Sequence, residues 1–176
     1  MNIHPLFVHF PIALLVVYSI MELIHTQRFN HSDTYASIKG FLVIVGTLAA
    51  YVTVSTGEIA EGILSAGGPE LARLVETHST FAGVSTAIFS LLAASYAVKF
   101  ILDSRYADVP VVNAGPFAPI WHALCVASRG VRESVFGQFL ALAGIICITI
   151  TGALGAAIVY GPDVDPIVSA VYRLFF

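Results

Sequence analysis

The chain has 176 residues, of which 57% are hydrophobic and 11% are charged, and its formal net charge is -3. A soluble domain carries about a quarter charged residues because water must wet its surface. This composition therefore excludes an ordinary soluble enzyme, a disordered chain and a basic nucleic-acid-binding protein. It predicts an all-α integral membrane protein that contacts the lipid bilayer and binds no nucleic acid.

Four uncharged, apolar stretches are candidates for membrane-spanning helices. A bilayer core of about 30 Å takes about 20 helical residues to cross. With their ends included, the stretches predict spans at about residues 4–24, 37–60, 75–101 and 135–160. We therefore expect a single membrane domain, residues 1–176, folded as a four-helix bundle.

A fifth uncharged run, residues 109–128, contains three prolines and is interpreted differently. Lipid cannot satisfy the backbone groups that so many helix breakers leave free. We expect its first half to be a loop, and residues 119–135 to form an interfacial helix with Trp121 at headgroup depth. Residues 107–133 would then form a Pro-rich cytoplasmic segment before the last span.

The basic residues predict how the bundle is oriented. Six of the eight lie in the two loops on one side of the predicted bundle: Arg28, Lys39, Lys99, Arg105, Arg129 and Arg132. By the positive-inside rule this side is cytoplasmic. We expect a multi-pass protein of the bacterial inner membrane, with both termini on the periplasmic side.

This orientation gathers the ionisable groups of the predicted spans at the outer end of the bundle. His4 and His9 open the first span, Glu58 and Glu61 lie where the second span returns, and His78 opens the third. Ionisable groups are costly in lipid, so they are candidates for function. We expect the functional site at this end.

His9 and His78 are the predicted axial ligands of one haem b. Two imidazoles from neighbouring helices can hold a haem inside a four-helix bundle. Stripes of small side chains on the second and fourth spans would leave room for the flat macrocycle: Gly46, Ala50, Thr53 and Gly57, and Gly144, Ile148, Thr151 and Gly155. His4, Glu58 and Glu61 are candidates for proton transfer or for supporting contacts.

The same residues leave other interpretations open. His9 and His78 could bind a non-haem metal together with Glu58 or Glu61, or they could simply be hydrogen-bonding residues. Stripes of small residues also serve tight helix packing. A metal or proton transporter is the weakest alternative, because the ionisable groups cluster at one end and line no path through the bundle.

The opening His4-Pro-Leu-Phe-Val-His-Phe-Pro11 resembles a bacterial four-helix membrane family catalogued as domain of unknown function 2231. The resemblance extends over nearly the whole chain, through Thr56-Gly57-Glu58, His78 and the Gly-rich end of the last span. This chain departs from the family at Gly155-Ala156, where the family has a Gly-Gly pair. The family has no established activity, but its joining to Rieske iron–sulfur domains in some relatives implies a redox setting.

The predicted function is that of a small b-type cytochrome-like electron-transfer subunit with its haem near the periplasmic face. Such a subunit would exchange electrons with a partner membrane or periplasmic redox protein and would not itself be an enzyme. The alternative is a cofactor-free accessory or structural subunit of a larger membrane complex.

Overall fold

The computed structural model describes residues 4–24, 32–64, 68–103 and 115–176. These residues form helices joined by short connections and contain no strand, which confirms the all-α prediction. The helices are α1 (His4–Leu23), α3 (Asp33–Leu64), α4 (Pro69–Leu102), α6 (Ala118–Glu133), α7 (Val135–Tyr160) and α8 (Pro166–Phe175).

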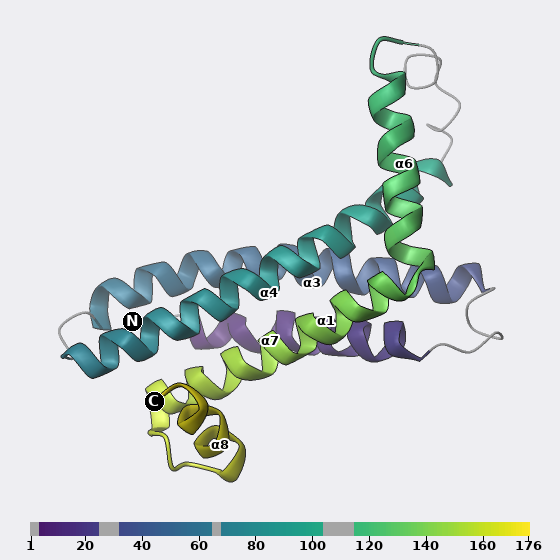
Figure 1. Ribbon diagram of the computed structural model, residues 1–176. Helices are drawn as coiled ribbons and strands as arrows, with labels where there is room; N and C mark the ends of the chain where they lie inside the picture. Colours follow the sequence, from purple (N-terminus) through teal and green to yellow (C-terminus); the bar gives the residue numbers. More distant parts are fainter. Residues whose placement is uncertain (1–3, 25–31, 65–67, 104–114) are drawn as a thin grey trace.

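Four of the helices form the predicted bundle. α3 packs against α1 and α4, and α7 packs against α4 and α1, so the four helices close a ring (Figure 1). α1 and α3 form one antiparallel hairpin, and α4 and α7 form the second. In the chain, α6 lies between α4 and α7. His4 and Glu22 lie near opposite ends of α1, so we call the two ends of the bundle the His4 end and the Glu22 end.

The bundle helices have the length and composition of membrane-spanning helices. α3 as far as Gly62, α4 and α7 are each long and apolar enough to cross a bilayer. The apolar part of α1, Phe7–Leu23, is shorter. The chain is therefore a membrane protein, while the crossing by α1 and the side on which the termini lie stay predictions.

The helix expected at residues 119–135 is present as α6, and it points away from the bundle (Figure 1). Ser134 separates it from α7, because its extended backbone ends α6 while its hydroxyl accepts a hydrogen bond from the Phe136 amide at 3.2 Å. Such a cap satisfies an amide at the start of the new helix. Residues 107–114 of the Pro-rich segment lie outside the described residues.

α8 packs against the His4 end of the bundle. Asp165 caps this helix by accepting hydrogen bonds from the amides of Ile167 and Val168, at 2.8 and 2.9 Å. Val168 is buried with Leu154 of α7 and Leu74 of α4. The Arg73 guanidinium donates to the Phe175 carbonyl at 3.4 Å, which further ties the end of α8 to the start of α4.

An apolar core separates the two ends of the bundle. Tyr18 and Phe89 are fully buried there and meet edge to face, with their ring centroids 6.3 Å apart. Two predicted small-residue positions serve this packing: a Cβ at Gly46 would lie 2.7 Å from Leu15, and a Cβ at Gly144 would lie 2.6 Å from the Phe89 ring. In this middle layer, the small-residue stripes serve helix packing.

Candidate functional site

The phase of α1 decides which of its two histidines faces the bundle. At 100° per residue, His4 and His9 are about 140° apart around the helix. His4 shares its face with Leu15 and Glu22, which are both buried. His9 lies on the exposed side of α1. The structure therefore directs His4, and not His9, into the bundle.

The His4 imidazole is anchored to the end of α3. Its Nδ1 lies 3.1 Å from the Thr53 carbonyl oxygen and 3.1 Å from Thr56 Oγ1. A carbonyl can only accept a hydrogen bond, so Nδ1 carries the proton and donates it. The ring nitrogen with the lone pair is therefore Nε2.

Pro11 explains why Thr53 lies so close to α1. A proline within a helix has no amide to donate, so the carbonyl four residues earlier loses its partner. In α1 this carbonyl belongs to Phe7, and Thr53 Oγ1 donates to it at 3.4 Å, as it also does to its own helix at 3.0 Å. A neighbouring hydroxyl that satisfies the freed carbonyl is the usual way in which membrane helices tolerate proline.

His78 repeats the arrangement of His4 in the second hairpin. Its Nδ1 lies 2.9 Å from the Thr151 carbonyl oxygen of α7. The same argument about the acceptor places the proton on Nδ1 and the lone pair on Nε2. Each hairpin thus ties one imidazole to a threonine carbonyl on its second helix.

A glycine supports each imidazole, four residues after the threonine whose carbonyl accepts its proton. A Cβ added at Gly57 would lie 3.2 Å from His4 Cε1, and one added at Gly155 would lie 3.1 Å from His78 Cε1. The outer glycines of the predicted stripes therefore accommodate imidazole rings, whereas Gly46 and Gly144 accommodate core side chains.

The two imidazoles lie at the same end of the bundle, His4 on α1 and His78 on α4. Each has its Nδ1 proton held by a backbone carbonyl, the arrangement that orients histidine ligands of metals and fixes which nitrogen binds. The site thus presents two Nε2 donors, one from each hairpin, at the His4 end.

The other predicted site residues lie apart from this pair. Glu58 and Glu61 are exposed on α3, and the described part of the chain records no hydrogen bond or ion pair for either. Within residues 4–24, 32–64, 68–103 and 115–176, no three or more His, Cys, Asp or Glu side chains come together as a metal site. The pairing of His9 with His78 stays a prediction, and the geometry favours His4.

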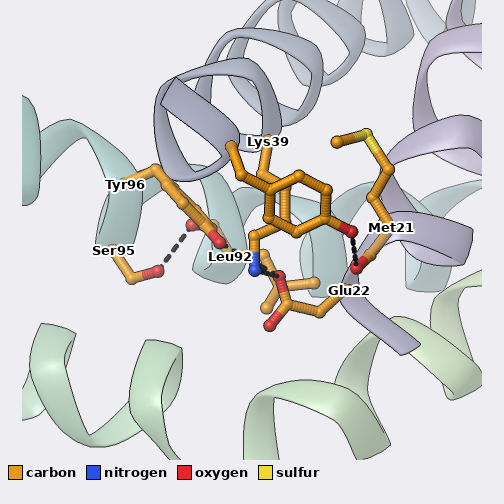
Figure 2. A network of polar contacts seen from close by, with 7 residues as sticks. Met21, Glu22, Lys39, Leu92, Ser95 and Tyr96 are labelled. Atoms are coloured by element: carbon orange, nitrogen blue, oxygen red, sulfur yellow. Dashed lines mark hydrogen bonds and ion pairs between the residues drawn. The ribbon is translucent and has the colours of Figure 1, made fainter. Parts of the chain in front are cut away.

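A second polar cluster, which the sequence analysis missed, lies at the Glu22 end. Glu22 and Lys39 are only 5% and 9% exposed, and their side chains form an ion pair of 3.1 Å (Figure 2). Tyr96 donates a hydrogen bond to the same carboxylate at 3.0 Å. The expectation that the ionisable groups gather at the outer end alone is therefore wrong, because Lys39 lies inside α3 and not in a loop.

Aromatic rings and a backbone contact complete the cluster. The Lys39 ammonium lies 5.4 Å from the centre of the Tyr35 ring and 5.9 Å from that of Tyr96, within cation–π range. The Tyr35 hydroxyl donates to the Met21 carbonyl at 2.7 Å. The cluster therefore links the end of α1 to α3 and α4.

Comparison with known proteins found no match to this chain. No family model matches the chain, and no curated protein or solved structure matches it. The resemblance to the family of unknown function stays a prediction, and the function proposed below depends on the geometry of the site.

Proposed function

We propose that the protein is a small membrane cytochrome that holds one haem b between His4 and His78 and transfers single electrons. The observation that carries the proposal is the pair of imidazoles from separate hairpins, each with its Nδ1 proton held by a threonine carbonyl. Bis-histidine ligation of haem iron needs this set of two Nε2 donors and no third ligand from the protein.

The donor chemistry of the two histidines suits a haem. The bound group would supply the one-electron chemistry, while the chain would hold and orient the axial ligands and keep the site apolar. The carbonyl contacts make each imidazole a stronger donor by polarising its Nδ1–H bond.

The position of the site at one end of the bundle bears on the partner. We infer that the His4 end faces the periplasm, since four of the six described basic residues, Lys39, Lys99, Arg129 and Arg132, lie on or near the Glu22 end, against Arg73 and Arg173 at the His4 end. One haem at the outer end cannot by itself carry electrons across the bilayer. The chain would therefore exchange electrons with a periplasmic or membrane redox partner on that side.

Single histidine substitutions test the assignment. We expect His4→Ala and His78→Ala each to abolish the sharp b-type band of the reduced-minus-oxidised spectrum, because each removes one axial ligand. His9→Ala is the matched control on α1 and should keep the band. The measurement is the spectrum of each variant purified in detergent, beside its haem content per chain.

The outcomes separate the candidate ligand pairs. Loss of the band in His9→Ala with retention in His4→Ala would restore the pair predicted from the sequence and contradict the present one. Haem-free, well-folded protein from haem-replete cells would contradict the cytochrome proposal for either ligand pair. The function would then be that of a cofactor-free accessory subunit.

A further inference from the structure

The last helix of the chain, α8, exposes large apolar side chains that the bundle does not cover. Ile167 and Leu174 are seven residues apart, so they share one side of the helix, and they are 65% and 75% exposed. This side lies beside the face of Val168 and Phe175, which packs against the bundle. The apolar surface of α8 is therefore wider than its contact with the bundle.

Another side of α8 is polar. Arg173 is exposed there, and the Ser169 hydroxyl donates to the Pro162 carbonyl at 2.9 Å. The helix has ten residues and rises about 15 Å, so it is too short to cross a bilayer. A short helix with one apolar and one polar side is typical of helices that lie in the plane of a membrane interface.

The end of α7 holds α8 at the boundary of the bilayer. The 26 residues of α7 rise about 39 Å, which exceeds the bilayer core of about 30 Å, so the ends of this helix reach the headgroups. Tyr160 in its last turn is 73% exposed, and tyrosine is enriched at that depth. Gly161 then ends α7 with a φ of 91°, and α8 folds back beside the end of α7 instead of continuing it (Figure 1).

Exposed apolar residues lead from the spanning helix into α8. Val159 is 63% exposed in the last turn of α7, and Val164 is 48% exposed in the connection that precedes Ile167. The exposed apolar side chains of a spanning helix contact lipid, because lipid surrounds the helix. The same lipid is therefore the surrounding that the free apolar side of α8 meets.

Contacts with α4 fix how α8 is rotated about its own axis. The Phe175 ring meets the edge of Phe81 with the centroids 5.2 Å apart. The Tyr172 hydroxyl donates to Glu70 Oε1 at 3.3 Å. Because these contacts hold the inner face of α8 against α4, Ile167 and Leu174 stay turned away from the bundle.

We propose that α8 lies at the boundary between the headgroups and acyl chains of the bilayer, with Ile167 and Leu174 among the acyl chains and Arg173 among the headgroups. Insertion removes two large aliphatic side chains from water, which is favourable. Asp163 and Asp165 precede the helix, so no excess of positive charge draws it to anionic lipid. The contact is with the apolar part of the bilayer, and the proposal does not depend on haem.

A nitroxide label on a single cysteine tests where these side chains lie. The label is placed by Ile167→Cys in a chain with serine in place of Cys125 and Cys147, reconstituted into phosphatidylcholine vesicles. Oxygen dissolves in the acyl chains, whereas a charge-neutral nickel complex stays in water, and both reagents are supplied on both sides of the membrane. The control is Arg173→Cys, which is exposed on the polar side of α8.

We expect the label at Ile167 to collide several-fold more often with oxygen, and several-fold less often with the nickel complex, than the label at Arg173. Leu174→Cys should repeat the result for Ile167→Cys, because the two residues share one side of α8. A label at Ile167 that meets the nickel complex as often as the control would place this side in water and overturn the proposal. A label that meets neither reagent would show that a protein chain covers this side, which would also contradict it.

Discussion

Replacing Glu22 with alanine is expected to lower the free energy of unfolding by about 3–5 kcal/mol, because the ammonium of Lys39 would stay buried without its carboxylate. The pair is nearly inaccessible, so neither water nor salt screens the loss. Lys39 would keep only the faces of Tyr35 and Tyr96, and cation–π contacts do not replace a salt bridge with a hydrogen-bonded carboxylate. Thermal unfolding in detergent measures the effect, on the order of 10 °C.

Two further variants make this result specific to the pair. Glu61→Ala removes an exposed carboxylate of α3 and should change the stability by no more than about 0.5 kcal/mol. The double substitution Glu22→Leu with Lys39→Met removes both charges and should restore stability close to that of the unmodified protein. A Glu22→Ala variant as stable as Glu61→Ala would show that the ion pair is not buried as described.

Replacing Gly155 with leucine is expected to abolish haem binding while leaving the chain folded. Even a bare Cβ at this position would lie 3.1 Å from His78, so the longer side chain must displace the imidazole from the Thr151 carbonyl. A ligand displaced by about 1 Å no longer meets the geometry of its site. Overpacking of this kind costs about 1–3 kcal/mol, which most bundles survive. The b-type spectrum and the melting curve of the same preparation measure both effects.

The matched control for this change lies on α4. Gly83 is exposed, and a Cβ there would meet no atom within 4 Å, so Gly83→Leu should keep both haem and fold. The helix propensity gained on replacing glycine with leucine is the same at both positions, which isolates the contact with His78. Full haem binding by Gly155→Leu would contradict the proposed role of this glycine.

The four apolar helices were predictable from the sequence because charged residues are rare in this chain, and the uncharged stretches between them have the length of a bilayer crossing. The choice between His4 and His9 was also within reach. His4, Leu15 and Glu22 repeat at the helical period, whereas the residues that share a face with His9 include Ile20, which is 47% exposed. The small residues on the neighbouring helices indicated the region where His4 and His78 lie, but they did not show which histidine of α1 faces it.

The buried ion pair could not be found in the same way. Glu22 and Lys39 each stand at the edge of an apolar run, where charged residues usually mark the boundary with water. Their burial depends on Tyr35 and Tyr96 covering them from α3 and α4, and one sequence does not reveal which helices pack together. The hydrogen bond from Thr53 to the Phe7 carbonyl could not be predicted for the same reason. Pro11 indicates only that a carbonyl on α1 lacks its usual amide donor.

The spectrum of the unmodified protein tests directly whether the imidazoles of His4 and His78 hold one haem b at the His4 end. Protein purified in detergent from haem-replete cells should show the sharp reduced-minus-oxidised band of a bis-histidine haem b, at close to one haem per chain. A folded, monodisperse and colourless preparation that also fails to take up added haem would contradict the claim.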